Sequence, residues 1–361
     1  MFKQTGTEDI MTHRTSRSAN AASWAAASLA AALALAACGQ SGDSADTAGD
    51  SAPAAAAAGG VYVSNEESNV VHVIDPDTLT ETGQIAVGER PRGMRLSPDG
   101  ARLYVAVSND NAIDVIDTAT AEVVGRLDSG PDPERFAISP DGGTIYIANE
   151  DDAYVSFLDI ASNTVTRTVP TGGEPEGMTV SPDGRFVVST SEVDSLAHIF
   201  DAETGAVVAE VPVGTRPRDA VFTPDGSRLL VSSEVGASVE IIDAATWEIV
   251  ETVGFGGPGT PDFVEENIQA VEMAITADGA RAYVALGRGN AVGEIDLATF
   301  AVTNYFPSGF RNWGLSMSPD ETRLYAAAGL SGDLTVIDLE AGESIETIQL
   351  GGRPWSVVAA R

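Results

Sequence analysis

Short apolar segments separated by turn residues recur along the chain from about residue 61 onward. In one unit they fall at Gly93–Ser97, Leu103–Val107, Ala112–Ile116 and Glu122–Leu127. Apolar residues in these segments alternate with polar ones or form brief runs, and β-branched residues are common, which is typical of strands. After residue 60 the sequence shows no sustained helical periodicity. The pattern therefore predicts an all-β protein built from units of four short strands.

A turn tetrad marks the period of these units. Ser97-Pro98-Asp99-Gly100 returns, with small changes, at residues 139, 181, 223, 276 and 318, a spacing of 42 with one step of 53. Pro fixes φ, Asp hydrogen-bonds the local backbone and Gly accepts a positive φ, so the tetrad predicts a tight turn. An aspartate that closes an apolar segment has the same spacing, at Asp75, Asp117, Asp159, Asp201, Asp243, Asp296 and Asp338. Both markers count the same units, and there are seven.

Four-strand units of about 40–45 residues are the signature of propeller blades. Val61-Tyr62-Val63 matches the second strand of a unit, and Trp355–Ala360 matches a first strand that lacks the rest of its unit. Pairing these ends completes a blade and removes the unpaired edges that a linear solenoid would leave. The sequence therefore predicts a seven-bladed β-propeller over residues 61–361, with four antiparallel strands per blade and a closing blade shared between the N- and C-terminal strands.

Residues 1–37 predict a signal peptide for export. A basic start is followed by a run of mostly Ala, Leu and Ser that is too short to be a typical membrane span. The run ends at Leu35-Ala36-Ala37-Cys38, which resembles the lipobox of bacterial lipoproteins, and Cys38 is the only cysteine. The resemblance implies acylation of Cys38 and a lipid anchor on the periplasmic side of the cell envelope; an ordinary cleaved signal is the alternative. Residues 38–60 lack aromatic and branched aliphatic residues and predict a flexible tether.

Composition narrows the classes of function. The 361 residues include 53 acidic and 20 basic side chains, a formal net charge of −33, which argues against nucleic acid as a partner. A single cysteine excludes a disulfide framework, a Cys-rich zinc site and covalent haem attachment. His72 and His198 occupy equivalent third-strand positions in blades three steps apart, so we expect no shared metal between them.

Tyr104-Val105, Val115–Thr118 and the turn tetrad that follows resemble the YVTN-type propeller repeat, and the resemblance covers all seven units. Other segments resemble bacterial propeller proteins associated with alcohol catabolism that depends on pyrroloquinoline quinone (PQQ). These segments are Ser129–Glu134, Ala148–Asp152, Glu174–Met178, Thr190–Glu192 and Ser232–Gly236. The resemblance implies a periplasmic protein that acts near quinoprotein dehydrogenases and a transporter, with no established reaction. The chain departs from that group at its N-terminal region, since the resemblance does not account for the lipobox or the long tether.

Alignment of the units predicts two rings of side chains at one mouth of the channel. The first ring is Arg92, Glu134, Glu176, Arg218, Val271, Trp313 and Trp355. The second ring, two residues earlier, is Arg90, Asp132, Glu174, Arg216, Gln269, Arg311 and Arg353. Neighbouring blades thus present an arc of four arginines and two tryptophans, then the acidic arc Asp132, Glu134, Glu174 and Glu176, and then Arg216 and Arg218.

Two interpretations of these rings stay open. The arginines and carboxylates can pair with each other and fasten the blades together. Alternatively, the arginines bind a carboxylate ligand and the tryptophans contact its flat ring, which would suit PQQ or an aromatic acid.

The predicted function is non-catalytic: binding a small anion, or a protein partner such as a basic cytochrome that the acidic surface would attract. The alternative is a lactonase, because seven-bladed lactonases share this type of repeat. Glu134 or Glu176 would then act as acid or base beside Arg92 or Arg218.

Two further loop features face the same mouth. The step of 53 residues places eleven extra residues between Gly254 and Ala270, either as a functional loop over the mouth or as a surface insertion. The loops between second and third strands carry the acidic groups Glu66, Glu67, Asp110, Glu150, Asp151, Asp152, Glu192, Asp194 and Glu234. Clustered oxygens can hold Ca²⁺, but we expect solvated turns instead.

Overall fold

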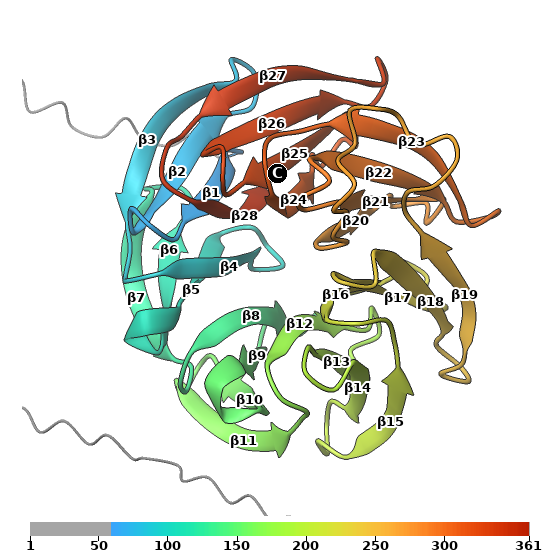
Figure 1. Cartoon of the computed structure of the whole chain (residues 1–361). Coiled ribbons are helices and arrows are strands. Elements are labelled where there is room, and N and C mark those ends of the chain that lie inside the picture. The colour runs from blue at the N-terminus through green and yellow to red at the C-terminus, as the bar shows by residue number, and fades with distance from the viewer. Residues whose placement is uncertain (1–58, 361) are drawn as a thin grey trace, which may run out of the picture. The chain divides into compact units, whose positions relative to one another are not determined.

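Seven four-stranded antiparallel sheets surround a central axis, as predicted (Figure 1). The computed structural model describes residues 59–360, so the predicted signal peptide, Cys38 and nearly all of the predicted tether lie outside the described residues. The closing blade has the order β28 (Pro354–Ala359), β1 (Val61–Asn65), β2 (Val70–Asp75) and β3 (Thr80–Ala86). Within the described range, no helix has the length and hydropathy that a membrane crossing requires.

The other six blades each use four consecutive strands. They are β4 (Pro91–Leu96), β5 (Arg102–Val107), β6 (Ala112–Asp117) and β7 (Glu122–Asp128); β8 (Pro133–Ile138), β9 (Thr144–Asn149), β10 (Tyr154–Asp159) and β11 (Thr164–Pro170); β12 (Pro175–Val180), β13 (Phe186–Ser191), β14 (Leu196–Asp201) and β15 (Val207–Pro212); β16 (Pro217–Phe222), β17 (Arg228–Ser233), β18 (Ser238–Asp243) and β19 (Ile249–Gly254); β20 (Met273–Ile275), β21 (Arg281–Ala285), β22 (Ala291–Asp296) and β23 (Ala301–Pro307); β24 (Asn312–Met317), β25 (Arg323–Ala328), β26 (Asp333–Asp338) and β27 (Glu343–Gln349). Short 3₁₀ turns follow β5 at Ser108–Asp110 and β9 at Glu150–Asp152.

The closing blade joins the two ends of the propeller. β1 pairs with β28 in antiparallel register, with Tyr62 opposite Val358 and Val63 opposite Val357. The Ala360 N–H also donates to the Gly60 carbonyl at 3.0 Å. Since every sheet then has its inner strand at the axis, the ring leaves no open end, and the linear solenoid is excluded.

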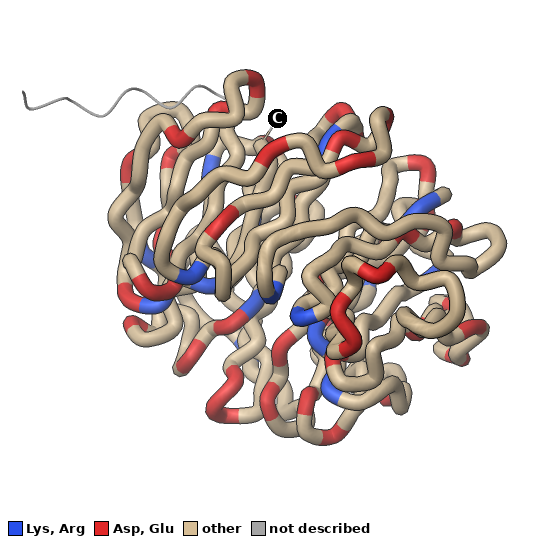
Figure 2. Tube along the Cα trace, turned by 45° about the horizontal axis from the view of Figure 1, so that its top comes forward, with Lys and Arg blue, Asp and Glu red and all other residues tan. Residues whose placement is uncertain are grey.

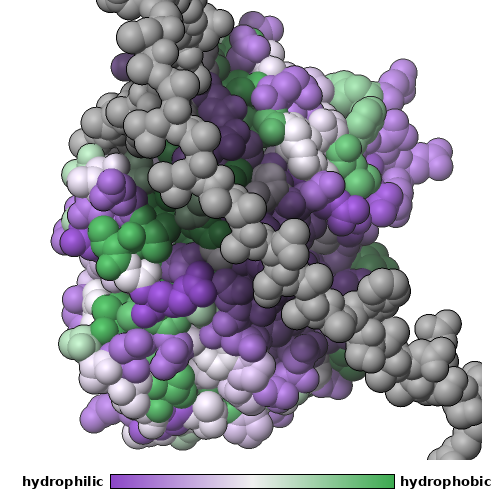
Figure 3. Space-filling view, turned by 90° about the vertical axis from the view of Figure 1, so that its left-hand side faces the viewer, coloured by the Kyte–Doolittle hydropathy of each residue, from purple (hydrophilic) through white to green (hydrophobic). Residues whose placement is uncertain are grey.

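The hydrophobic core is divided into seven clusters, each lying between two neighbouring blades. One of them joins Val63 of β1 and Val357 of β28 to Tyr325 and Leu334 of the preceding blade. The uncovered part of the side shown in Figure 3 mixes hydrophobic patches with hydrophilic residues. Burial between sheets therefore stabilises the ring as a whole.

The predicted turn chemistry is present at the Pro-Asp-Gly repeats. Asp141 accepts hydrogen bonds from Ser139 Oγ at 2.6 Å and from the Gly143 N–H at 3.0 Å, and Gly142 has φ 73°. These hydrogen bonds stabilise the carboxylate and lower the pKa of Asp141.

A second backbone feature shapes the opposite end of the inner strands. The positions of Arg90, Asp132, Glu174, Arg216 and Arg311 all have positive φ, between 39° and 59°. A register shift follows within most inner strands, for example between Pro91 and Met94. This shift breaks the usual alternation, so consecutive side chains can both be directed toward the axis.

We expect Leu334→Ala to lower the free energy of unfolding by about 2–5 kcal/mol, because it opens a cavity between the last full blade and the closing blade. The matched control is Leu330→Ala, whose side chain is 54% exposed; its cost should stay below about 0.5 kcal/mol. Urea denaturation followed by intrinsic fluorescence measures both. Equal costs would show that the interface at the closing blade does not contribute as described.

Candidate functional site

One mouth of the channel opens into a cavity of about 320 Å³. All eight residues predicted as ligand contacts line it: Arg90, Arg92, Arg216, Arg218, Arg311, Trp313, Arg353 and Trp355. They come from the inner strands β4, β16, β24 and β28 and from the residues just before them. Figure 2 shows basic positions gathered toward the middle of the molecule, whereas acidic positions also cover the outer loops.

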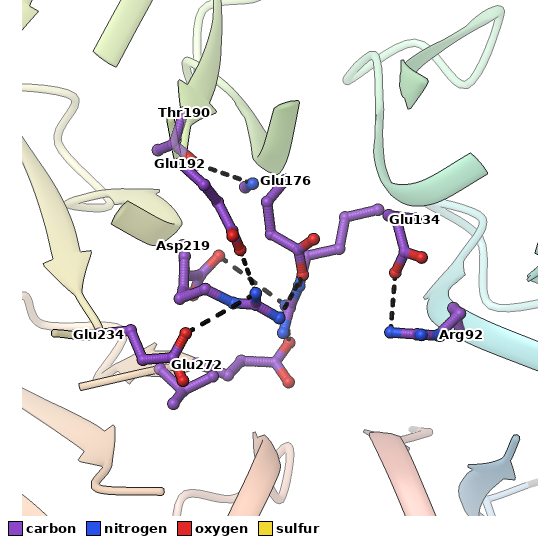
Figure 4. Close-up of polar contacts among 12 residues, drawn as sticks. Arg92, Glu134, Glu176, Thr190, Glu192, Asp219, Glu234 and Glu272 are labelled. Atoms are coloured by element: carbon purple, nitrogen blue, oxygen red, sulfur yellow. Dashed lines mark hydrogen bonds and ion pairs between the residues drawn. The ribbon is translucent and has the colours of Figure 1, made fainter. Parts of the chain in front are cut away.

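The first group of arginines is paired with the acidic arc. Arg90 lies 3.1 Å from both Asp132 and Glu134. Arg92 lies 3.0 Å from Glu134 and 3.1 Å from Glu66 (Figure 4 draws the Arg92–Glu134 pair). Glu134 is fully buried. Its burial raises its pKa well above the usual value, although both arginines oppose the shift.

The second group of arginines is paired in the same way. Arg218 is buried and contacts Glu176 at 2.9 Å, with Glu192 hydrogen-bonded to it as well. Arg216 lies 2.7 Å from Glu192 and 3.1 Å from Glu234. Of the two interpretations of the rings, charge pairing therefore holds for four arginines: Arg90, Arg92, Arg216 and Arg218. Glu174, the remaining member of the acidic arc, is exposed and forms no ion pair within residues 59–360.

The expectation that the acidic groups in the loops between second and third strands lie in solvated turns is wrong for Glu192 and Glu234. They are 5% and 3% exposed and serve as counter-charges for the arginines. Glu66 also turns inward, to Arg92. These loops end at the mouth, where a guanidinium group compensates the cost of removing a carboxylate from water. The sequence shows the acidic residues, but only the ring of blades brings them to the arginines.

Burial dominates the titration of this network. It raises the pKa of Glu192 to about 7, against the opposing charge of Arg218. It also raises the pKa of Asp219 to about 6, against Arg135.

A further ring, which sequence reasoning missed, closes the channel below the mouth; we call it the waist. It lies one residue after the first ring in each blade: Gly93, Arg135, Gly177, Asp219, Glu272, Gly314 and Ser356. Arg135 is buried, with its Nη1 3.0 Å from Glu272 and 4.0 Å from Asp219, and its Nε 3.7 Å from Glu176. Figure 4 shows these carboxylates converging. The same spacing of 42 and 53 gives these positions, but strict strand alternation would direct their side chains away from the axis, and only the register shift brings them to it.

The waist also connects neighbouring blades. Asp219 accepts a hydrogen bond from the Met273 N–H at 2.9 Å, and Glu272 accepts one from the Leu315 N–H at 3.1 Å. Gly314 is needed at its position, because a Cβ there would lie 2.6 Å from the Trp355 carbonyl oxygen. The inner strands therefore approach closely enough for one buried guanidinium to contact carboxylates from several blades.

The two tryptophans of the mouth already contact arginines. The guanidinium carbons of Arg311 and Arg218 lie 4.4 Å and 4.7 Å from the Trp313 ring centroid. Trp355 similarly contacts Arg135 at 4.7 Å and Arg92 at 5.2 Å. A flat ligand ring that stacked on either indole would have to compete with these cation–π contacts.

Arg311 differs from the other arginines of the mouth. Among residues 59–360 its guanidinium forms no ion pair and no hydrogen bond, and its buried Nε has no partner. Burial, followed by the charge of nearby Arg288, lowers its pKa. Arg288 is exposed, and its guanidinium likewise has no ionic or hydrogen-bond partner within the described range. Arg353 is exposed and only loosely paired, 3.7 Å from Glu66.

The insertion between β19 and β20 lies beside this mouth. A second cavity, of about 650 Å³, is lined by Asp262, Val264, Glu265, Glu266, Asn267, Arg288, Asn290, Phe310, Arg311 and Leu330. Arg311 and Leu330 line both cavities. Val264 packs into the adjacent core cluster, and the Glu265 N–H donates to the Gly289 carbonyl at 3.1 Å. The insertion is thus fixed on the mouth side. Arg288 was not among the mouth residues predicted from the sequence, because it follows the irregular spacing of 53 residues.

Two groups of residues have side chains of the types that bind metals: the acidic cluster at the mouth and the two histidines. Oxygens of Asp132, Glu134 and Glu150 lie within 4.8 Å of one another, but Arg90 and Arg92 already compensate two of these carboxylates. His72 contacts Asn65 and Glu81 through its two ring nitrogens, and His198 contacts Gly172 and Glu210. The histidines lie on β2 and β14 of different blades, as predicted.

Fold and site together define a seven-bladed β-propeller with an ionic mouth above a closed waist. The profile of the YNCE-like beta-propeller family matches residues 16–151, and that of the cytochrome D1 heme domain matches residues 99–229. These matches confirm the propeller repeat predicted from the sequence.

Solved structures share the fold at low sequence identity. Hydrazine synthase of Kuenenia stuttgartiensis is 20% identical, with a TM-score of 0.66, over 74% of this chain and 92% of that chain. A putative 6-phosphogluconolactonase of Bacteroides uniformis is 17% identical, with a TM-score of 0.69, over 84% and 100%. The dihydro-heme d1 dehydrogenase NirN is 16% identical, with a TM-score of 0.61, over 83% and 74%. Identities this low show the fold alone.

A curated relative matches only a short stretch. PE-PGRS family protein PE_PGRS18 of Mycobacterium tuberculosis is 52% identical over 40 residues, which are 11% of this chain. The chain covers 9% of that protein's length.

The cytochrome D1 profile and NirN raise haem as a ligand class. Haem iron takes axial ligands such as His, Cys, Met or Tyr. None of these residue types is among the residues that line the mouth cavity. The mouth of the described propeller therefore does not fit a haem ligated through its iron.

Glu192 predicts a specific pH dependence of stability. Its pKa is about 7 in the folded protein and about 4.3 in an unfolded chain, so the folded state binds more protons between these values. The free energy of unfolding should therefore fall as the pH rises from about 4.3 to about 7.

Glu192→Gln should make this fall smaller, as measured by urea denaturation at pH 5 and pH 8. The matched control is Glu251→Gln, on the exposed outer strand β19. The assignment is wrong if the wild type and Glu192→Gln lose the same free energy between the two pH values.

Proposed function

We propose that this protein is a non-catalytic binding propeller that holds a small organic anion at the mouth of its channel. The observation that carries the proposal is the half-buried Arg311, whose guanidinium has no anionic partner within residues 59–360 although most arginines around it are ion-paired. The protein has 53 acidic residues, so counter-charges are abundant elsewhere.

Electrostatics supports an anion at this place. Arg288 and Arg311 line the same cavity, and the charge of Arg288 lowers the pKa of Arg311. A buried donor without a partner costs free energy, and two neighbouring cations repel each other. A bound carboxylate would relieve both costs, because guanidinium groups form paired hydrogen bonds with carboxylates.

The finer parts of the proposal rest on sequence. Export and a lipid anchor at Cys38 on the periplasmic side rest on the lipobox, and a place near PQQ-dependent alcohol oxidation rests on the resemblance of the mouth segments. PQQ carries several carboxylates, and aromatic acids carry one, so both are suitable probes. A quinoprotein dehydrogenase, a cytochrome or a transporter component would then be the partner protein.

We expect isothermal calorimetry to detect binding of PQQ or benzoate to the full chain, and Arg311→Gln to weaken it at least about tenfold, because one charge-assisted contact contributes about 1.5–3 kcal/mol. The control is Arg185→Gln, whose exposed side chain lies away from the mouth near the Pro-Asp-Gly turns. Absence of heat with PQQ, with benzoate and with acetate, or equal weakening in both variants, would contradict the proposal.

The lactonase alternative keeps one observation in its favour, since Glu176 lines the mouth cavity beside Arg218 and a putative 6-phosphogluconolactonase shares the fold. However, Glu176 is 2% exposed and already ion-paired, which leaves it poorly placed to act on water. We expect the full chain to hydrolyse gluconolactone no faster than buffer does. Turnover that disappears in Glu176→Gln, but not in the exposed control Glu174→Gln, would establish the enzyme instead.

A further inference from the structure

The exposed large apolar side chains fall into two groups. Seven lie on outer strands: Val123, Val124, Val207, Val208, Ile249, Val250 and Ile345. Five lie in loops on the mouth side: Val193, Val235, Phe263, Phe310 and Leu330. Isolated apolar residues on outer strands are ordinary. The second group is unusual, because it surrounds part of an otherwise ionic mouth.

The loop residues change character around the ring. At the tip of the loop between second and third strands, successive blades carry Glu67, Asn109, Asp151, Val193, Val235, Arg288 and Leu330. Three consecutive blades are therefore acidic or polar, and the next four present apolar residues and one arginine. Arg288 lies within the apolar half, beside the unpaired Arg311.

Phe310 and Leu330 are the exposed apolar residues that share a cavity with both arginines. They are 60% and 54% exposed, and Val264 of the insertion lines the same cavity. The cavity of about 650 Å³ lies within the range of small-molecule sites, about 300–1,000 Å³. Its lining thus combines two cations, an apolar wall and the three exposed carboxylates of the insertion, Asp262, Glu265 and Glu266.

The tryptophans offer less room for an apolar group. Each indole already contacts two guanidinium groups, with centroid distances of 4.4–5.2 Å. The apolar part of a ligand held by Arg311 therefore has a better surface on the outer side, toward Phe310, Leu330 and the insertion, than deeper in the channel. There it would cover side chains that are now in water.

We propose that the ligand is an amphipathic carboxylate, a free organic acid whose head binds Arg311 and Arg288 and whose apolar body lies against Phe310 and Leu330. The inference rests on the proposed function and adds the chemical class of the ligand and the direction in which it lies. The insertion contributes Val264 and the exposed carboxylates Asp262, Glu265 and Glu266 to the lining of this site. Those carboxylates disfavour any anionic group of the ligand that lies near the insertion, so the apolar body is directed there.

The test is a chain-length series of acetate, butanoate, hexanoate and octanoate, titrated into the full chain and followed by calorimetry. Each added methylene should raise the affinity about two- to fourfold, because burial of a methylene is favourable by an amount of that order. The double variant Phe310→Ser and Leu330→Ser should flatten this rise while acetate binding stays unchanged. Arg311→Gln should weaken every member of the series by a similar factor.

The matched control is Val193→Ser with Val235→Ser, which removes two exposed apolar residues of the same face that line neither cavity. It should leave the series unchanged. Acetate binding that depends on Arg311 but does not strengthen with chain length would overturn this inference and leave the anion site standing. If no carboxylate binds, including PQQ and benzoate, both proposals fail.

Two other outcomes would also overturn the inference. One is an unchanged chain-length dependence in the Phe310/Leu330 double variant, which would place the body elsewhere. The other is binding to phosphatidylcholine vesicles that contain oleate without binding to free octanoate, which would identify a lipid surface as the source of the carboxylate.

Discussion

The ion pairs of the buried Arg135 are the interaction on which the rest of the structure depends. This guanidinium lies at the axis with Glu272 at 3.0 Å and Asp219 at 4.0 Å, from two other blades. A charge removed from water is tolerated only when paired charges and hydrogen bonds compensate it, so these inner strands must keep their positions. The same carboxylates accept hydrogen bonds from the backbone N–H groups of Met273 and Leu315 and so connect the three consecutive blades that begin with β16, β20 and β24.

Buried charges at the mouth, above the waist, are also compensated by partners of opposite charge. Arg92 and Arg218 are each paired with one glutamate of an inner strand, Glu134 of β8 and Glu176 of β12. Each also contacts a glutamate of a loop between second and third strands, Glu66 and Glu192 respectively. The two interpretations of the rings therefore apply to different parts of the mouth. Charges are paired around Arg92 and Arg218, and the proposed anion site lies at Arg311. Within residues 59–360 most arginines of the ring are ion-paired, whereas Arg311 and the neighbouring Arg288 are not.

The difference between the paired and unpaired parts of the mouth suggests how a ligand site can arise in a propeller. The blades share the same four-strand hydrogen-bonding pattern, and each packs its hydrophobic core only against its two neighbours, so equivalent positions at the mouth can differ in side chain. A single sector can then change, here by the insertion of eleven residues and the apolar side chains Phe310 and Leu330, without disturbing the ring. The fold fixes where a ligand can lie, and the sector decides its chemistry.

The sequence by itself determined the all-β class, the number of blades, the shared closing blade and the two rings at the mouth, because a fixed period and closure convert residue spacing into angular position. It did not reveal the waist at Arg135, since a shift in strand register turns that position toward the axis. Nor did it show that Glu192 is buried or that Arg288 adjoins Arg311. Those contacts join residues far apart along the chain, and only the distances between packed blades decide which charges meet.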